Sequence, residues 1–286
     1  MSESIRPEEL RVSFAGKGFH PRLAVVLGSG LSAAAARLPC EEQISFDCVD
    51  GLHSPSVKGH PGHIHLFGES IILFAGRNHL YESGDMSQAG AVVRVAARLG
   101  CRSILLTQAA GSLKRSIPVA SWLLPTDIIS LPYRGARSVD GMDGTFDSAE
   151  GKVGRTPGYV GSGPSAGRMC IRTSLISVAM RDNVALAAAT AGVKLRDGVL
   201  FWATGPNYET AAEAVMLERL GASAATMSPL PELAAAVEVG LDAACLTWIT
   251  NHTVNVSAVG TGHDSVVRAG KKSVGSLLAI LKAMEG

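Results

Sequence analysis

The sequence of 286 residues is long enough for one large α/β domain or two small ones, and 47% of its residues are hydrophobic. The net charge is +1, so no overall field draws the chain to nucleic acid or to an anionic membrane. The five cysteines are scattered without a close Cys-x-x-Cys pair, which argues against zinc or redox sites and indicates a reducing compartment. No long apolar stretch follows Met1, so we expect a cytoplasmic protein with no nucleic-acid or membrane partner.

Short apolar, β-branched runs alternate with longer helical patterns along the chain, which predicts an α/β fold. Strands are predicted over residues 23–27, 70–74, 103–107, 122–129, 199–203, 222–227 and 244–250. Helices are predicted over 88–99, 172–192, 209–220, 231–239 and 264–284. In helix 209–220, the spacing predicts a buried face made of Ala212, Val215, Met216 and Leu220. Residues 133–167 are rich in Gly, Ser, Asp, Pro and Arg, so we expect one domain, 1–286, interrupted there by a long flexible or functional loop.

The first polar cluster follows the predicted strand 23–27. In open α/β sheets, ligands collect beyond the carboxyl ends of strands. Gly28 and Gly30 flank Ser29 at such an end, which predicts backbone N–H groups that face a bound anion. A tight turn from strand to helix is the alternative. The third glycine of a dinucleotide fingerprint and the lysine of a P-loop are both missing, so the glycines alone identify neither motif.

A glycine-flanked histidine loop forms the second cluster, over residues 58–63. His60, His63 and His65 have a spacing that suggests a metal site, but no carboxylate or cysteine accompanies them at ligand spacing. We therefore expect no metal, and we interpret His60 as a hydrogen-bonding partner of an oxyanion. A loop histidine without a ligand remains the alternative.

The third cluster, Arg77, His79 and Tyr81, follows the predicted strand 70–74. If the strand continues, these side chains project to one face, because side chains alternate along a strand. A guanidinium fork, an imidazole and a phenol together suit a phosphorylated or polyhydroxyl ligand. The alternative is a solvated edge strand. Residues 107–112, predicted as a turn of small residues, permit either a close ligand or tight helix packing.

Further polar residues lie in the C-terminal third: Tyr208 and Glu209 at a helix start, then Met227, Ser228, Thr250, Asn251 and His263. A carboxylate at a helix start is favoured by the helix dipole, so simple capping is one explanation of Glu209. Its combination with Asn251 at another strand end favours recognition of a flat heterocycle.

The sequence resembles the trimeric purine nucleoside phosphorylases from about Leu23 to the C-terminus, apart from the central loop. The resemblance rests on the order and spacing of Gly28-Ser29-Gly30-Leu31, Gly59-His60, Arg77-Asn78-His79-Leu80-Tyr81, Ala109-Ala110-Gly111, Gly205-Pro206-Asn207-Tyr208-Glu209-Thr210, Met227-Ser228 and Thr250-Asn251. It implies a single α/β domain with a mixed, barrel-like central sheet flanked by helices. It also implies a homotrimer, phosphate as co-substrate, and no metal or organic cofactor.

The resemblance assigns roles by motif position. The residues expected to hold phosphate are Ser29, His60, Arg77, Ala109 and Ser228. Those expected on the ribose side are His79, Tyr81, Met227 and His263, and those at the base are Tyr208, Glu209, Thr250 and Asn251. Among them, we expect His79, Glu209 and Asn251 to be catalytic.

The chemistry of the bond agrees with these roles. Cleavage of a purine N-glycosidic bond develops positive charge on ribose and negative charge on the base, so it needs an anion beside the sugar and donors at the base. The amide of Asn251 can bond O6 and N7 of a 6-oxopurine, and an ionised Glu209 fits the N1–H of hypoxanthine or guanine. Adenine has a bare N1 acceptor and leaves that carboxylate unpaired. We therefore expect phosphorolysis of inosine or guanosine to the free base and ribose 1-phosphate.

Two alternatives remain open. The methylthioadenosine phosphorylase branch of the family reads adenine and normally has an aspartate at the position of Asn251. A non-catalytic nucleoside-binding homologue is the second alternative. The sequence also departs from the family pattern at Gln108, where asparagine is usual, and at Ser112, Pro229 and His252. Phe146 and Tyr159 are the candidates for an aromatic side chain lent to a neighbouring subunit, and the preference between ribose and 2′-deoxyribose stays open.

Overall fold

The computed structural model describes residues 4–37, 43–57, 59–131, 175–253 and 263–285. The predicted loop 133–167, with Phe146 and Tyr159, lies outside these residues. The described strands form one sheet in the order β2-β3-β4-β1-β5-β8-β7-β6-β9. Their bounds are β1 (Leu23–Leu27), β2 (Gln43–Ser45), β3 (His63–Phe67), β4 (Ile71–Ala75), β5 (Ser103–Ser112), β6 (Trp122–Ser130), β7 (Leu195–Trp202), β8 (Ala224–Thr226) and β9 (Asp242–His252).

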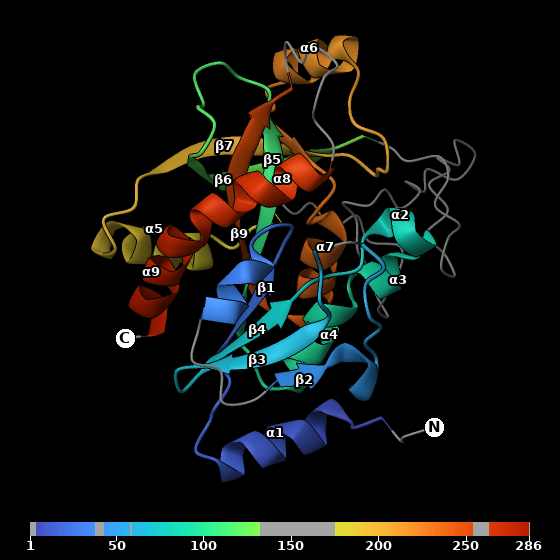
Figure 1. Ribbon diagram of the computed structural model, residues 1–286, viewed down its shortest axis with the longest axis vertical. Coiled ribbons are helices and arrows are strands. Elements are labelled where there is room, and N and C mark those ends of the chain that lie inside the picture. The colour runs from blue at the N-terminus through green and yellow to red at the C-terminus, as the bar shows by residue number, and fades with distance from the viewer. Residues whose placement is uncertain (1–3, 38–42, 58, 132–174, 254–262, 286) are drawn as a thin grey trace, which may run out of the picture.

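The sheet closes on itself because β5 pairs with β9 as well as with β1 and β8. Strands β5, β8, β7, β6 and β9 therefore form a ring, and β1, β4, β3 and β2 continue the sheet from β5 (Figure 1). Pairing is parallel in β1–β4, β1–β5, β5–β9, β6–β7 and β7–β8, and antiparallel in the other pairs. The expected mixed, barrel-like sheet in an α/β domain is confirmed.

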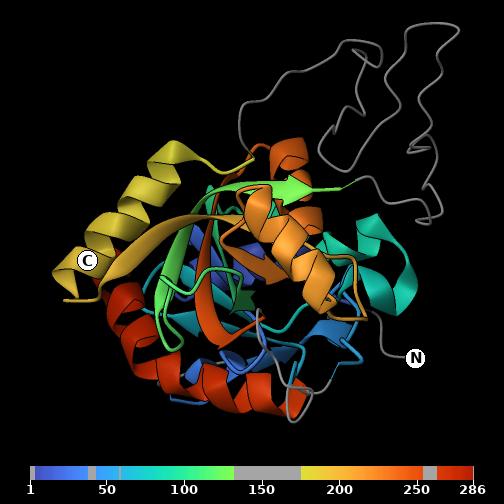
Figure 2. The same ribbon diagram turned by 90° about the horizontal axis from the view of Figure 1, so that it is seen from above.

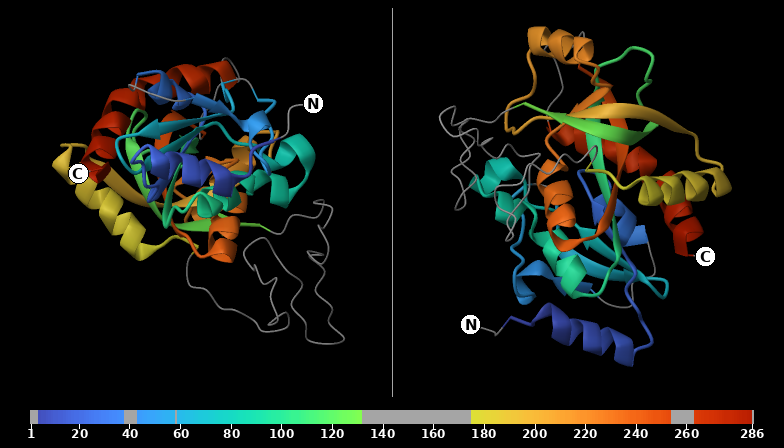
Figure 3. Two further views of the ribbon diagram at one scale, coloured as in Figure 1. Left: turned by 90° about the horizontal axis from the view of Figure 1, so that it is seen from below. Right: turned by 180° about the vertical axis from the view of Figure 1, so that it is seen from behind.

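Helices cover the outside of this sheet. They are α1 (Pro7–Gly16), α2 (Leu80–Ser83), α3 (Met86–Ala89), α4 (Ala91–Arg98), α5 (Val178–Thr190), α6 (Ala211–Arg219), α7 (Leu230–Val239), α8 (His263–Gly270) and α9 (Val274–Glu285). Seen from above, α5, α8 and α9 lie around the ring of strands (Figure 2). Helices α4 and α7 pack against each other, and α1 closes the opposite end of the molecule from α6 (Figure 3). None of the helices in the described ranges is long and apolar enough to span a bilayer.

The core follows from the central position of β1. All five of its residues are buried, and β4 and β5 pair with it on its two sides. A strand buried on both faces reads as a continuous apolar run, as Leu23–Leu27 does. This is why the sequence alone located it correctly.

Two predicted helices are interrupted. The helix expected over 88–99 is split between α3 and α4 at Gly90, where an added Cβ would lie 2.8 Å from the Cβ of Ala235 on α7. Gly90 therefore permits the close approach of α7. The helix expected over 264–284 is divided into α8 and α9 by a 3₁₀ turn, Lys271–Ser273.

The predicted buried face of α6 is wrong. Ala214 and Leu217 are buried, whereas Val215, Met216 and Leu220 are 37%, 43% and 52% exposed. The helix sits on one end of the ring and packs through only a narrow stripe (Figure 1).

Other strands are longer than expected or were missed. Strand β5 continues through Ser112, so the turn predicted over 107–112 is wrong; β8 and β9 pair with this half of the strand and hold it extended. Strand β9 likewise continues to His252. Helix α1 and strands β2 and β3 were not predicted. Polar side chains interrupt their apolar pattern, and β3 begins inside the segment interpreted as a histidine loop.

Candidate active site

A pocket lies where β5, β8 and β9 meet the segments that follow β1 and β4. The space between its lining atoms is about 680 Å³, with open solvent included. Most of the predicted site residues line it: Ser29, His79, Tyr81, Ala109, Tyr208, Glu209, Met227, Ser228, Thr250 and Asn251. His60 and Arg77 lie behind its wall. His263 begins α8, and its side chain is outside the described part of the structure.

The loop after β1 lies directly on β5. A Cβ at Gly28 would fall 2.5 Å from the carbonyl oxygen of Thr107, so only glycine permits this approach. The N–H of Gly28 donates to Thr107 Oγ1 at 3.3 Å. This N–H group, one of those expected to face a bound anion, is therefore already hydrogen-bonded. The N–H groups of Ser29 and Gly30 and the Ser29 hydroxyl are therefore the donors that this loop can offer to an anion.

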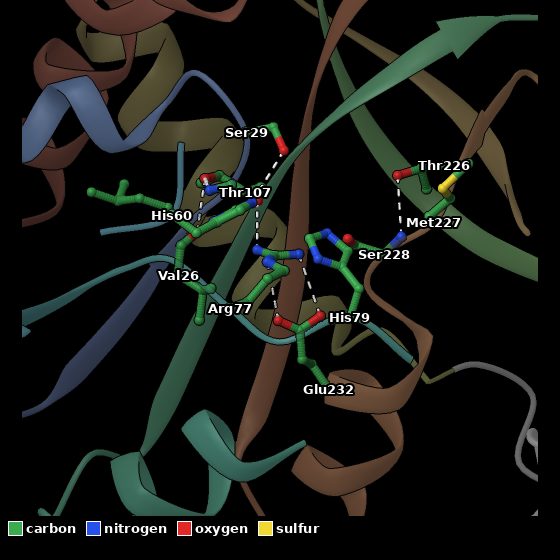
Figure 4. A network of polar contacts seen from close by, with 12 residues as sticks. Val26, Ser29, His60, Arg77, His79, Thr107, Thr226, Met227, Ser228 and Glu232 are labelled. Carbon is green, nitrogen blue, oxygen red and sulfur yellow. Dashed lines mark hydrogen bonds and ion pairs between the residues drawn. The ribbon is translucent and has the colours of Figure 1, made fainter. Parts of the chain in front are cut away.

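His60 supports that loop from behind. It is 5% exposed, and its Nε2 lies 3.2 Å from Ser29 Oγ (Figure 4). Its ring also meets that of His79 edge to face, with centroids 5.2 Å apart. In this arrangement, His60 reaches a ligand through Ser29.

Arg77 is directed away from the pocket surface. The strand ends at Ala75, so the expectation that Arg77, His79 and Tyr81 share one strand face is wrong. The Arg77 side chain is 1% exposed; its Nη2 donates to the Thr107 carbonyl at 2.6 Å, and its Nη1 and Nε lie 3.3 Å from the carboxylate oxygens of Glu232 (Figure 4). Burial raises the pKa of Glu232 to about 7, and the Arg77 charge opposes that rise.

His79 is held by Glu82, one turn further along α2. Its backbone N–H and its Nδ1 both contact Glu82 Oε1, the latter at 3.2 Å, while Ser56 donates to the other carboxylate oxygen at 2.6 and 2.8 Å. Although burial opposes ionisation, these hydrogen bonds lower the pKa of Glu82 to about 2. A charged Glu82 beside Nδ1 fixes the orientation of the His79 ring.

Tyr81 forms part of the wall of the pocket. Its ring stacks on that of His79, with centroids 5.0 Å apart and planes 17° apart, and burial raises the pKa of its hydroxyl to about 12. Gly205, at φ +74°, lets another segment approach: an added Cβ would lie 2.5 Å from Tyr81 Cδ1 and 2.7 Å from Met227 Sδ. Because its pKa is raised, the Tyr81 side chain stays a neutral phenol near neutral pH and keeps a hydroxyl that can donate a hydrogen bond.

Glu209 is not the cap of α6. Thr210 is the N-cap residue, and it forms a capping box with Glu213, whose N–H it accepts at 3.2 Å. The capping explanation of Glu209 is therefore wrong, and its carboxylate lines the pocket. Burial raises the pKa of Glu209 above its ordinary value. The neighbouring Tyr208 is 54% exposed at the mouth of the pocket.

A β-bulge brings Thr250 and Asn251 into the pocket together. Between the pairs Ala110–Ile249 and Gly111–Asn251, the register shifts and Thr250 is the extra residue. In a regular strand adjacent side chains face opposite sides, but here both line the pocket. The Thr250 hydroxyl lies 2.8 Å from Asn251 Oδ1, which leaves Nδ2 as the donor for a ligand. An added Cβ at Gly111 would be 3.2 Å from that Nδ2.

Sequence reasoning missed several contributors. Glu232 is a single carboxylate in a buried, otherwise apolar run of α7, and that isolation is a signal for a buried partner. Glu82 follows His79 at the spacing of a capping box, which could also have been noticed. The bulge has no sequence signal. In the described ranges, no group of three or more His, Cys, Asp or Glu side chains is placed to hold a metal ion.

The chain is similar in sequence to a known family. The model of the phosphorylase superfamily matches residues 22–284. The chain is 30% identical over 270 residues to purine nucleoside phosphorylase of Mus musculus, covering 91% of this chain and 86% of the relative. It is 27% identical to purine nucleoside phosphorylase 1 of Geobacillus stearothermophilus, with 92% and 90% covered.

Solved structures show the same fold. The crystal structure of Schistosoma mansoni purine nucleoside phosphorylase in complex with adenosine superposes with a TM-score of 0.74 at 20% identity, covering 97% of this chain and 95% of the other. A second, of isoform 2 with cytosine and ribose-1-phosphate, gives 0.73 at 21% identity, covering 98% and 95%. The chain belongs to the phosphorylase superfamily and, within it, to the purine nucleoside phosphorylases.

Proposed function

We propose that this protein phosphorolyses 6-oxopurine nucleosides such as inosine and guanosine, yielding the free base and ribose 1-phosphate. The observation that carries the proposal is that Glu209 and Asn251 line the same pocket as Ser29 and Ser228. A carboxylate acceptor and an amide donor thus face one ligand whose other end meets an anion loop. Relatives named purine nucleoside phosphorylase, with about nine-tenths of their length matched, support the same class of reaction.

At the anion end, phosphate is proposed to bind to Ser29, Ala109 and Ser228. His60 supports Ser29, and Arg77 adds its positive charge from behind Thr107. An unprotonated phosphate oxygen attacks C1′ while the bond from C1′ to N9 breaks, and the bonding electrons leave with the purine. The negative phosphate therefore stabilises the positive charge on the ribose before the new bond from phosphate oxygen to C1′ is complete.

At the base end, negative charge develops on the leaving purine. The Asn251 Nδ2 donates to O6 or N7 as that charge grows, and ionised Glu209 accepts the N1–H. In the balanced reaction, the proton lost from monohydrogen phosphate is the one that the free base gains. His79, Tyr81, Met227 and His263 are proposed to hold the ribose.

Adenosine is the competing substrate. Its N1 has no hydrogen to give to Glu209, and its 6-amino group is a donor that meets the donor Nδ2 of Asn251. Both contacts favour the 6-oxopurines. The methylthioadenosine branch of the family is disfavoured for the same reason.

One assay tests the proposal. The protein is incubated with inosine, guanosine and adenosine, each with and without phosphate, and base and sugar phosphate are separated and measured. We expect inosine and guanosine to be cleaved only when phosphate is present. Release of base without phosphate would contradict phosphorolysis, adenosine as the best substrate would contradict the assignment of the base end, and no cleavage would favour the non-catalytic alternative.

The assembly is part of the proposal. We propose a cytoplasmic homotrimer, on the basis of the family resemblance. Sedimentation equilibrium should then give three times the chain mass, and a monomer would contradict this.

A further inference from the structure

Strands β5 and β8 stop pairing at the pocket. Their antiparallel register ends at the pair Gly111–Ala225. Beyond this pair, Ala109 on β5 and Thr226 on β8 both line the pocket. The two strand ends are therefore no longer joined by their backbone pairing at this level, and a side chain joins them instead.

The hydroxyl of Thr226 is that link. It donates to the carbonyl oxygen of Ala109 at 3.0 Å, and it accepts the N–H of Ser228 at 3.3 Å (Figure 4). A carbonyl oxygen can only accept and an N–H can only donate, so both roles of the hydroxyl are fixed by its partners. One side chain therefore holds a backbone group on β5 and another in the segment that follows β8.

Thr226 and Ala109 are themselves held in place. Thr226 is 7% exposed, and its carbonyl oxygen accepts the N–H of Ala203, the residue after β7, at 2.8 Å. Its branched Cβ also restricts rotation of its side chain. Ala109 is held on its other side by the pairing of β5 with β9. The hydroxyl therefore ties the segment after β8 to a fixed strand.

A different side chain holds the residue between Thr226 and Ser228. The carbonyl oxygen of Met227 accepts from Trp202 Nε1 at 3.3 Å. Loss of the Thr226 hydroxyl would leave this bond in place. Because Met227 is proposed to lie at the ribose and Ser228 at the phosphate, the two hydrogen bonds act on different substrates.

We propose that Thr226 is a positioning residue, whose hydroxyl holds Ser228 against Ala109 so that both meet the same bound phosphate. The proposal rests on the proposed function, which assigns phosphate to these two residues. With the hydroxyl removed, the N–H of Ser228 loses its bond to Thr226, and phosphate must order this segment when it binds. The free energy needed for this ordering is subtracted from that of binding, so phosphate should bind more weakly.

A purely structural role for Thr226 makes a different prediction. A link that only stabilised the ring of strands would raise the free energy of unfolding and would favour neither substrate. The KM for phosphate and the KM for the nucleoside would then change together or not at all when the hydroxyl is removed. The split between the two constants therefore distinguishes positioning from stabilisation.

The test compares two substitutions at this position. Thr226→Val replaces the hydroxyl by a methyl group of similar size, whereas Thr226→Ser keeps the hydroxyl. The matched control, Thr126→Val, removes an exposed hydroxyl on β6 that donates to the Gly198 carbonyl at 3.2 Å. For each protein, phosphate affinity is measured by calorimetry, and KM is measured for phosphate at saturating inosine and for inosine at saturating phosphate.

In Thr226→Val, we expect the Kd and the KM for phosphate to rise about tenfold, the effect of one hydrogen bond in a buried site. The KM for inosine should change by less than about twofold, because the bond from Trp202 to Met227 remains. Thr226→Ser and the control should keep the phosphate affinity of the parent. If Thr226→Val does not fold, Thr226→Ala removes the same hydroxyl and replaces it in the test.

Three results would overturn the assignment: unchanged phosphate affinity in Thr226→Val, an equal loss in Thr226→Ser, or an equal rise in both KM values. A parent that binds phosphate but cleaves no nucleoside would contradict the proposed function, and weaker phosphate binding in Thr226→Val alone would still support the role of Thr226. A parent that phosphorolyses inosine, matched in every constant by Thr226→Val, would contradict only the role of Thr226. A parent that binds no phosphate would contradict both.

Discussion

The polar side chains at the two ends of the pocket differ in whether other protein side chains hold them in place. At the proposed anion end and beside it, polar side chains are held by one another: Ser29 by His60 and Arg77 by Glu232 at the anion, and His79 by Glu82 next to them. At the proposed base end, the carboxylate of Glu209 lines the pocket, and Tyr208 is more than half exposed. The first group is organised before any ligand arrives, whereas the proposed function gives the second group its partners only when a purine is bound.

This difference predicts that substitutions at one end affect folding stability, whereas substitutions at the other end affect substrate specificity. Substitutions at the anion end should lower the free energy of unfolding together with activity, because they leave buried partners unpaired. Substitutions at the base end should change the choice of substrate and leave stability almost unchanged. The following predictions are ordered from the largest expected effect to the smallest.

The largest effect is expected at the buried ion pair. Glu232→Ala should lower the free energy of unfolding, measured by urea denaturation, by about 3–5 kcal/mol, because Arg77 is left charged and buried. The matched control is Glu238→Ala on the same helix, whose partner Arg94 is about one-third exposed; it should cost at most about 1 kcal/mol. If both variants lost the same free energy of unfolding, the buried pair at the anion end would contribute no more to stability than a surface pair, which would contradict the comparison.

Asn251→Asp tests the base end. The aspartate cannot donate to O6 or N7, so kcat/KM for inosine should fall about 100-fold, while adenosine improves relative to it. The free energy of unfolding should change by less than about 1 kcal/mol. Asn183→Asp, on the exposed face of α5, is the control for both measurements. Unchanged substrate preference would remove Asn251 from the recognition of the base.

Glu82→Gln loosens the support of His79. We expect kcat/KM for inosine to fall about tenfold at saturating phosphate, because a neutral amide fixes the imidazole less strongly. The pKa of Glu82, lowered to about 2, lies below that of the unfolded chain, so its stabilisation is complete above the unfolded value of about 4.3 and is lost as the pH falls toward 2. Acid titration of the unfolding free energy should show this loss in the parent and a shallower one in the variant.

The smallest effect concerns pH and substrate choice. Burial raises the pKa of Glu209, so its carboxyl gains a proton at a higher pH than an exposed glutamate does. The ionised form accepts N1–H from hypoxanthine, while the protonated form can donate to N1 of adenine. From about pH 8 to about pH 5, kcat/KM for adenosine relative to inosine should rise about fivefold at saturating phosphate. Glu209→Gln should flatten the change, and an equally pH-dependent ratio in that variant would contradict the role of Glu209.

The sequence was informative where a single local pattern decides the structure. The apolar run of β1 and the ordered polar motifs located the sheet core and most of the pocket wall. The sequence failed where distant pairing decides: the small residues of β5 are extended only because β8 and β9 hold them, and Arg77 is buried because Glu232, far along the chain, receives it. Such long-range partners leave no local signature.

The extra residue Thr250 has a consequence for how this pocket can change in evolution. Substitutions alter one lining side chain at a time, but deletion of a single codon at position 250 would restore regular alternation along β9. Asn251 would then have no adjacent side chain on its own side of the sheet. The length of the strand, and not only its composition, is therefore inherited as part of the site, and insertions or deletions at this point should be far less tolerated than in the surface loops.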